Sequence, residues 1–307
     1  MYRRQFLHNS LAAGFASFLP SGDRNKSQFP AEPRARLAVS SYPFRSLIRS
    51  ATRDADGLNQ SGMTLEDFAA TIPRRFQVDG IEPWSRHFES TDSGYVGRLQ
   101  AGFQKAAVHV VNIPVDLSVA LCDGDPQKRS AGLEQYQKWI DAAVILKSPS
   151  IRVHVPAKTE DKADIQCALD TLHVLASYGE NKKIVVNLEN DNPHTEDPFT
   201  IVELLKTVNS PYLRALPDFC NSMLIGDDPA YNQRGLQAMF RYAFNISHVK
   251  DSENDRGKVY TVDVNDIFEI AKKARYRGYF SMEWEGDGDP YAGTSDLLRK
   301  SLTALAG

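Results

Sequence analysis

The stretch KIVVNLENDNPHTEDPFTIVELLKTVNSPYLRALPDF, residues 183–219, decides the fold class of this chain. Two short apolar runs, 183–189 and 213–219, enclose a segment in which apolar residues recur at helical spacing. The runs are mostly apolar rather than alternating, which is typical of strands buried on both faces of a parallel sheet. The stretch therefore predicts a strand, a helix and a second strand parallel to the first.

The same unit repeats along the chain after Arg36. Strand-like segments lie at 37–42, 79–84, 108–114, 151–156, 183–189, 213–219, 245–250 and 279–284. Helical patterns separate them. One begins after Thr64 with Asp67 three residues on, as in a capping box, and another is expected to end at Gly179. Eight such units over roughly 270 residues predict a single-domain α/β fold, a (β/α)₈ TIM barrel, over residues 36–307.

A doubly wound open sheet is the main competing architecture. Such a sheet usually carries a glycine-rich turn after its first strand. Here the turn reads SSYPFRS, residues 40–46, and contains no glycine. The barrel is therefore preferred.

The charge of the chain argues against a nucleic-acid partner. The 307 residues include 36 Lys and Arg against 39 Asp and Glu, a formal net charge of −3. Five of the basic and two of the acidic residues lie in the first 35 positions, so the remainder carries −6. Binding to phosphates depends on neutralisation by Lys and Arg, which such a body does not favour.

The N-terminus, MYRRQFLHNSLAAGFASFLPSG, resembles a twin-arginine export signal. Arg3 and Arg4 precede a short apolar stretch, although Tyr2 and His8 depart from the usual motif. The stretch is too short to span a bilayer, so no stable membrane anchor is expected. The resemblance implies a signal peptide and linker over residues 1–35, the Tat export machinery as a partner, and a periplasmic or secreted protein. The alternative is a basic amphipathic N-terminus of a cytoplasmic protein.

The three cysteines are expected to be free thiols. Cys122, Cys167 and Cys220 are odd in number and include no CxxC spacing. Neither a disulfide framework nor a zinc knuckle is implied by such a set.

Four residues at the ends of successive predicted strands indicate a metal site. Glu189, Asp218, His248 and Glu283 are 29, 30 and 35 residues apart, each about one strand–helix unit. Strand ends meet at the functional face of a barrel. Alone, each has an ordinary reading, such as a helix cap or a satisfied polar residue. Together, three carboxylates and an imidazole suit a divalent metal ion.

The chain also resembles the sugar phosphate isomerase/epimerase superfamily of xylose-isomerase-like barrels, from about Leu37 to the C-terminus. The segments that carry the resemblance are DAAVILKSPSIRVHVP, VVNLENDNPHTEDP, ALPDFCNS, NISHVKDSE and ARYRGYFSMEWEGDGDP. In its ketose epimerase branch, metal ligands come from Glu, Asp, His and Glu on strands five to eight, which match Glu189, Asp218, His248 and Glu283. The resemblance implies one divalent ion, usually Mn²⁺ and sometimes Mg²⁺, Co²⁺ or Zn²⁺. It also implies that Glu189 and Glu283 are the catalytic acid and base.

The expected reaction is proton transfer next to a carbonyl, through an enediolate that the metal stabilises. Return of the proton to the same centre from the opposite face gives an epimerase, and return to the neighbouring carbon gives an isomerase. A lyase acting on a keto-sugar, an inosose or an oxidised glycoside is the second reading. A barrel that only binds sugar in the periplasm is the third. The endonuclease branch of the superfamily needs more histidines and three metals, and is disfavoured.

Several residues at or near strand ends are predicted to contact the substrate: Tyr42, Glu82, Trp84, Arg152, His154 and Lys250. For Arg152 and Lys250 the alternative is ion pairing with nearby carboxylates, and for Tyr42 and Trp84 it is ordinary packing. The loop WEGDGDPYAG after the last strand is acidic and would repel a phosphate. A free sugar or keto-sugar is therefore expected, and whether the chain forms a homo-oligomer stays open.

Overall fold

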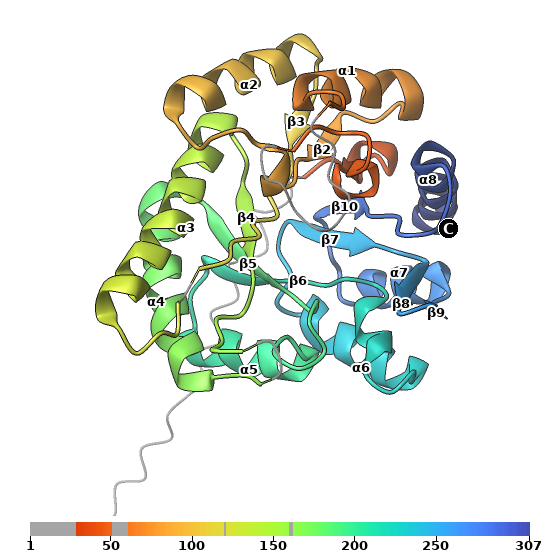
Figure 1. Ribbon diagram of the computed structural model, residues 1–307. Helices are drawn as coiled ribbons and strands as arrows, with labels where there is room; N and C mark the ends of the chain where they lie inside the picture. Colours follow the sequence, from red (N-terminus) through yellow and green to blue (C-terminus); the bar gives the residue numbers. More distant parts are fainter. Residues whose placement is uncertain (1–28, 51–60, 120, 160–161) are drawn as a thin grey trace, which may run out of the picture.

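The computed structural model describes residues 29–50, 61–119, 121–159 and 162–307. The predicted signal peptide, except for the end of its linker, lies outside these ranges. The described chain folds as a barrel of parallel strands inside a ring of helices (Figure 1). The barrel strands are β1 (Leu37–Ser40), β2 (Gly80–Glu82), β3 (His109–Val110), β4 (Ser150–Val153), β5 (Val185–Glu189), β6 (Leu213–Leu216), β7 (Ile246–Val249) and β10 (Tyr279–Met282). The TIM barrel prediction is confirmed.

Isolated backbone bridges close the barrel, including one from Ala215 in β6 to Ala243 before β7. Parallel pairing runs in the orders β3-β2-β1-β10-β7 and β4-β5-β6. Pro114 pairs with Arg152, which joins the chain after β3 to β4. Asp218 pairs with His248, which joins the chain after β6 to β7. Residues predicted for the site therefore also take part in the pairing that completes the ring.

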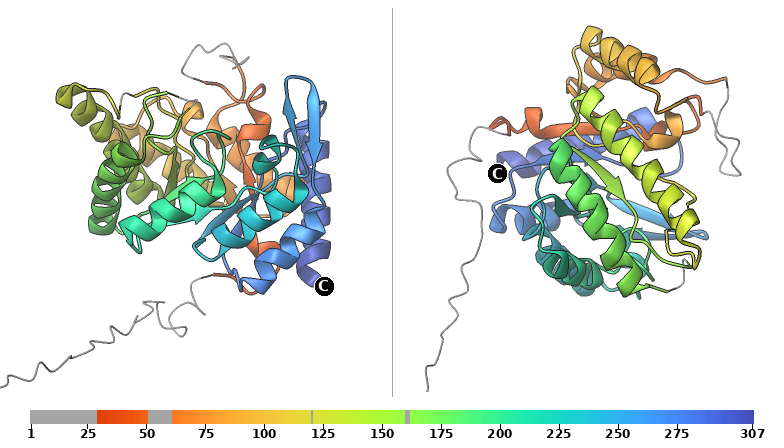
Figure 2. Two further views of the ribbon diagram at one scale, coloured as in Figure 1. Left: turned by 90° about the horizontal axis from the view of Figure 1, so that it is seen from below. Right: turned by 90° about the vertical axis from the view of Figure 1, so that its left-hand side faces the viewer.

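Helices lie around the outside of the strands, as two further views also show (Figure 2). The described residues form eight α-helices. They are α1 (Leu65–Phe76), α2 (Ser93–Lys105), α3 (Pro126–Leu146), α4 (Ile165–Lys182), α5 (Pro198–Val208), α6 (Pro229–Phe240), α7 (Val264–Lys273) and α8 (Pro290–Ala306). The capping box of Thr64 and Asp67 at the start of α1 is confirmed. None of the described helices has the length and apolar character that a membrane span requires.

Helices α3 to α8 each start at an aspartate. The carboxylate of that residue accepts a backbone N–H of the first turn, as is typical of N-caps. In α3, α5, α6 and α8 a proline follows at once, at the position where a helix needs no N–H donor. Asp-Pro therefore marks the point where many of the strand-to-helix loops end.

The end predicted for α4 is wrong. The helix passes Gly179 and ends at Lys182, with Lys183 in the left-handed conformation at φ 64°. A Cβ on Gly179 would lie 2.4 Å from the carbonyl oxygen of Ile184. The glycine therefore allows the helix to approach the chain that enters β5, and it does not terminate the helix.

The two faces of the strands differ in chemistry. Outward residues such as Val39, Ile81 and Leu188 belong to the large apolar core beneath the helices. Inside the barrel, a small apolar cluster of Ala38, Val111, Leu216 and Ile246 fills one layer. Inward positions nearer the C-terminal ends of the strands are polar and fully or nearly buried: Glu82, Arg152, Asn187, Glu189 and His248. The interior thus contains both apolar and buried polar or charged side chains.

A two-stranded hairpin that the sequence analysis did not predict lies between β7 and α7. Strands β8 (Ser252–Asp255) and β9 (Lys258–Thr261) pair antiparallel. Arg256 and Gly257 form the turn with φ values of 51° and 83°, and such positive values match the twist of a tight hairpin. Both strands are polar and largely exposed, so they lack the apolar run that marks the barrel strands.

The prediction of free thiols is wrong for two of the three cysteines. Cys122 and Cys167 form a disulfide, with their Cα atoms 5.7 Å apart. It joins the loop after β3 to the first turn of α4. Their 45-residue separation gives no local motif, and only the barrel brings the two segments together. Cys220 is free, as predicted, and it is buried.

Removing this disulfide is expected to lower the free energy of unfolding by about 2–4 kcal/mol, because the cross-link restricts the unfolded chain. Urea denaturation of the wild type and of a Cys122→Ser/Cys167→Ser variant measures the difference. A reductant should destabilise the wild type and leave the double variant unchanged. Equal stability of the oxidised wild type and the variant would contradict the prediction.

Candidate metal site

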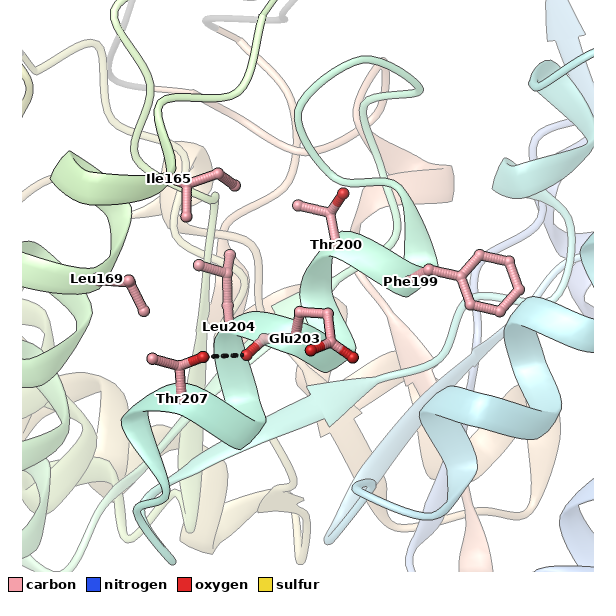
Figure 3. A pocket seen from close by; sticks show the side chains of 7 residues that line it. All are labelled: Ile165, Leu169, Phe199, Thr200, Glu203, Leu204 and Thr207. Atoms are coloured by element: carbon pink, nitrogen blue, oxygen red, sulfur yellow. Dashed lines mark hydrogen bonds between the residues drawn. The ribbon is translucent and has the colours of Figure 1, made fainter.

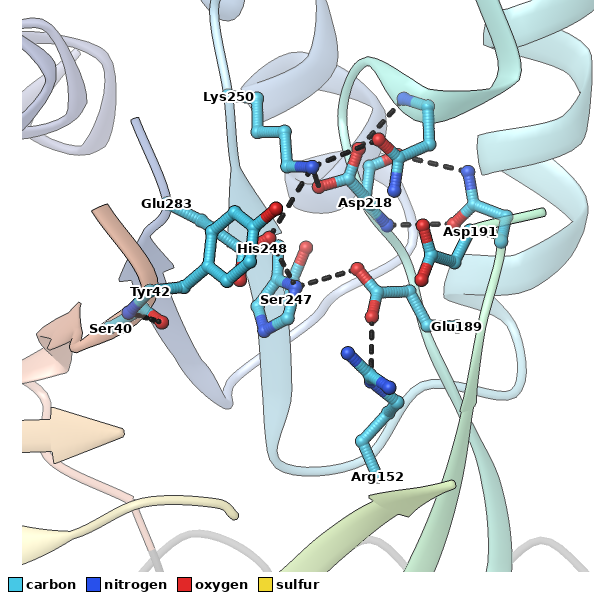
Figure 4. Close-up of polar contacts among 12 residues, drawn as sticks. Ser40, Tyr42, Arg152, Glu189, Asp191, Asp218, Ser247, His248, Lys250 and Glu283 are labelled. Atoms are coloured by element: carbon cyan, nitrogen blue, oxygen red, sulfur yellow. Dashed lines mark hydrogen bonds and ion pairs between the residues drawn. The ribbon is translucent and has the colours of Figure 1, made fainter. Parts of the chain in front are cut away.

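Four inward side chains at the C-terminal ends of neighbouring strands converge on one point. Glu189 ends β5, Asp218 follows β6 by two residues, His248 lies in β7, and Glu283 directly follows β10. All four are at most 5% exposed. One potential ligand atom from each lies within 4.8 Å of the others. The close-up shows these side chains on neighbouring strands, pointing toward one another (Figure 4). The structure thus brings together the residues that the strand spacing selected.

The imidazole of His248 lies between carboxylates on both sides. Its Nδ1 is 2.6 Å from Glu189 Oε1 and 3.1 Å from Glu283 Oε2. Its Nε2 is 3.0 Å from Glu82 Oε1. Nδ1 therefore faces the centre of the cluster, and Nε2 faces away from it.

Asp218 presents one unused oxygen. Its Oδ1 accepts the backbone N–H groups of Cys220 and Asn221, at 2.9 and 2.8 Å. Its Oδ2 is buried without a hydrogen-bond partner among the described residues, and Lys250 Nζ is 3.9 Å away. A buried carboxylate oxygen without a donor is costly unless a cation is bound to it.

Two buried cations flank the cluster. Arg152 Nε is 2.9 Å from Glu189 Oε2, and its Nη1 pairs with Asp116. Lys250 Nζ is 3.0 Å from Asn221 Oδ1, 3.1 Å from Glu253 Oε2 and 3.5 Å from Glu283 Oε2, and it also pairs with Glu285. The ion-pairing alternative for these two cations is what the structure contains.

Burial and charge pull the acidity of the cluster in opposite directions. Burial alone would raise the pKa of Glu189 and of Glu283. The positive charges of His248 and Arg152 more than offset this effect and lower the pKa of Glu189, and those of His248 and Lys250 do the same for Glu283. The resulting pKa of Glu283 is about 2. For Asp218 burial prevails, and its pKa is well above the ordinary value despite Lys250. Burial opposes the charge on His248, but Glu189, Glu283 and Glu82 raise its pKa well above the usual range.

The donor set fits a divalent cation. The carboxylates and the imidazole are hard-to-borderline ligands, as Mn²⁺, Mg²⁺, Co²⁺ and Zn²⁺ accept. The unpartnered Oδ2 of Asp218 points to the same conclusion, because an ion at the centre would satisfy it. The neighbouring Arg152 and Lys250 neutralise part of the negative charge of Glu189 and Glu283.

The residues predicted to bind substrate lie in different surroundings. Tyr42 and Trp84 pack edge to face, with ring centroids 5.0 Å apart, and Trp84 is nearly buried. Arg152 lies in β4 and His154 directly follows the strand, with Arg152 Nη1 and His154 Nε2 2.9 Å apart. Glu82 is 0% exposed and lies behind His248.

The sequence analysis missed two acidic loop residues that contact these predicted substrate-binding side chains. Asp116, in the loop after β3, accepts the Nε1–H of Trp84 at 2.6 Å and pairs with Arg152 and His154. Glu196, after β5, accepts the N–H of Val155 at 2.7 Å and lies 3.1 Å from His154 Nδ1. Both lie in loops, where no periodicity identifies them.

A second concave feature lies away from these residues. A groove of about 390 Å³ between α4 and α5 is lined by Ile165, Leu169, Phe199, Thr200, Glu203, Leu204 and Thr207 (Figure 3). Its lining is mainly apolar, and it includes none of the converging ligand residues. The converging charges, and not this groove, mark the candidate site.

Solved structures with the same fold include proteins of sugar metabolism. The chain matches an L-ribulose 3-epimerase with a TM-score of 0.67 and 14% identity, covering 89% of this chain and 96% of that one. It matches 3-keto-D-glucoside 4-epimerase from E. coli with a TM-score of 0.64 and 16% identity, covering 87% and 99%. A xylose isomerase-like TIM barrel protein from Mycobacterium smegmatis, solved in complex with magnesium, gives 0.68 and 15%, covering 90% and 100%.

These identities show a shared fold. Curated protein sequences gave no match. A family model described as "Xylose isomerase-like TIM barrel" matches residues 74–305, which is most of the chain and includes all four converging residues. The protein therefore belongs to the xylose isomerase-like TIM barrel family.

Proposed function

We propose that the protein is a metal-dependent isomerase or epimerase of a free sugar or keto-sugar. The observation that carries the proposal is the convergence of Glu189, Asp218, His248 and Glu283, with the unpartnered Oδ2 of Asp218 among them. The epimerases of the same fold give independent support. A divalent ion held by the four residues, with Mn²⁺ our first choice, would polarise the substrate carbonyl and stabilise the charge that develops on it.

Glu189 and Glu283 are the acid and base in this proposal. One carboxylate removes the proton from the carbon next to the carbonyl. In an epimerase the other carboxylate then protonates the same carbon from the opposite face, and in an isomerase the first carboxylate delivers the proton to the neighbouring carbon. Both groups are ionised at neutral pH. The pKa of Glu283 is low, and the pKa of Glu189 is also lowered, although burial opposes this shift. Asp218 and His248 hold the ion without moving a proton of the substrate.

The charges around the site favour a neutral substrate. The carboxylates near the cluster are Glu82, Asp116, Asp191, Glu196, Glu253 and Glu285, in addition to the three proposed ligands. Arg152 and Lys250 each pair with at least two carboxylates, so their positive charges are already neutralised and would not bind a phosphate. Arg152, His154, Lys250, Tyr42 and Trp84 would then contact hydroxyl groups of the sugar and shape the pocket.

We also infer that the protein is exported through the twin-arginine pathway. The arginine pair lies outside the described residues, but the disulfide offers independent support, since such bonds persist in oxidising compartments. Folded export would allow the metal to be acquired in the cytoplasm.

Replacing Glu189 or Glu283 by Gln should slow exchange of the substrate α-proton by about 10²–10⁴-fold. Exchange is followed by NMR in D₂O at saturating Mn²⁺, with ketoses, 3-keto-glucosides and inososes as substrates. Glu203→Gln, on the exposed side of α5, is the control and should keep full activity. Unchanged exchange in both variants would reject the two-carboxylate mechanism. Loss of water or of an aglycone would identify a lyase, and binding without turnover a sugar-binding barrel.

Asp218→Asn should stabilise the metal-free protein and weaken metal binding. The pKa of Asp218 is raised in the folded state, so its ionisation opposes folding once the pH exceeds the ordinary value of 3.8. At neutral pH the amide removes this cost, on the order of 1 kcal/mol or more. Loss of one ligand should weaken Mn²⁺ binding at least about tenfold. Urea denaturation with EDTA and with Mn²⁺ tests both effects, and destabilisation in EDTA would contradict the first.

Arg3→Lys/Arg4→Lys should retain the protein in the cytoplasm with Cys122 and Cys167 reduced. Cell fractionation locates the protein, and thiol labelling before and after reduction reports the disulfide. The wild type should be found in the periplasm with the disulfide formed. A wild type that stays in the cytoplasm would refute export.

A further inference from the structure

The side of His248 that faces away from the metal ligands is tied to a buried polar chain. Its Nε2 lies 3.0 Å from Glu82 Oε1, and both side chains are 0% exposed. The same carboxylate oxygen accepts the Nδ2–H of Asn112 at 2.8 Å. Glu82 thus has two donors on one oxygen, and neither is solvent.

The polar chain continues across the barrel interior. Asn112 Oδ1 accepts the hydroxyl of Ser150, whose oxygen accepts the Nδ2–H of Asn245 at 2.8 Å. Asn245 also donates to the carbonyl of Val111 at 2.9 Å, and its Oδ1 accepts from Asn187 at 3.2 Å. These side chains are all 0% exposed. A carboxylate held in this way has little freedom to rotate.

This arrangement determines which nitrogen of His248 is available. A neutral imidazole carries one proton, and an ionised carboxylate can only accept it. When a metal ion replaces the proton on Nδ1, Glu82 beside Nε2 would keep the remaining proton on Nε2, so that the lone pair of Nδ1 is available to the ion. Carboxylates in this position fix the tautomer and raise the basicity of the ligating nitrogen.

We propose that Glu82 is a positioning residue that orients His248 for metal ligation through Nδ1, and that Asn112 holds Glu82 in place. The proposal rests on the proposed metal site and replaces the expectation that Glu82 contacts the substrate. A side chain with no exposed surface behind the imidazole has no access to a sugar.

The test measures Mn²⁺ affinity without substrate, by electron paramagnetic resonance of the free ion. Glu82→Leu should weaken binding about 10–100-fold. Glu82→Gln keeps an acceptor oxygen at the same place and should restore most of the affinity. Asn187→Ala is the matched control, because Asn187 is equally buried but lies at the far end of the polar chain. It should bind Mn²⁺ like the wild type, whatever its stability in urea.

A second measurement covers the case in which Glu82→Leu does not fold. In the Zn²⁺-loaded wild type labelled with ¹⁵N-histidine, long-range ¹H–¹⁵N spectra report which ring nitrogen carries the proton, and His248→Gln assigns the signal. A protonated Nε2 supports the proposal, and a protonated Nδ1 overturns it. Equal Mn²⁺ affinity of Glu82→Leu and the wild type also overturns it, while leaving the metal site intact. A wild type that binds neither ion rejects the metal site itself.

Discussion

The contact of the His248 imidazole with carboxylates on both of its edges is the interaction on which the site depends. Glu189 and Glu283 lie at Nδ1 and Glu82 lies at Nε2, all in a water-poor interior where unpaired charge is expensive. In the metal-free protein, the imidazolium, Arg152 and Lys250 balance this negative charge. A divalent ion would take over part of that role. The concentration of buried negative charge therefore makes the interior receptive to a metal.

The barrel strands hold these charged side chains in fixed positions. Asp218 and His248 are backbone partners at one of the bridges that close the ring, so this pair contributes to both ligand placement and closure. The buried polar chain from Glu82 to Asn187 lies in the barrel interior together with the apolar cluster of Ala38, Val111, Leu216 and Ile246. Buried hydrogen bonds therefore hold Glu82 in place beside His248.

Periodicity was sufficient to predict the barrel and the convergence of its four strand-end residues. Each strand–helix unit of the fold has about the same length in sequence, so residues at successive strand ends recur at that spacing. It could not reveal Asp116 or Glu196, which reach the site from loops without a period. It also failed for the Cys122–Cys167 disulfide and the β8–β9 hairpin. The disulfide depends on segments brought together only in three dimensions, and the hairpin strands are polar. Gly179 shows a further limit, since a glycine near a helix end also serves close packing.

The aspartate caps of α3 to α8 have a consequence for what approaches the strand ends. A helix N-terminus carries a partial positive charge and free N–H groups, and in many α/β proteins it attracts anions. Here each of these helix starts already has a carboxylate on its N–H groups. The dipoles that would otherwise draw a phosphate are neutralised within the chain. The helix N-termini near the strand ends therefore do not offer the anion-binding N–H groups that this architecture would otherwise provide.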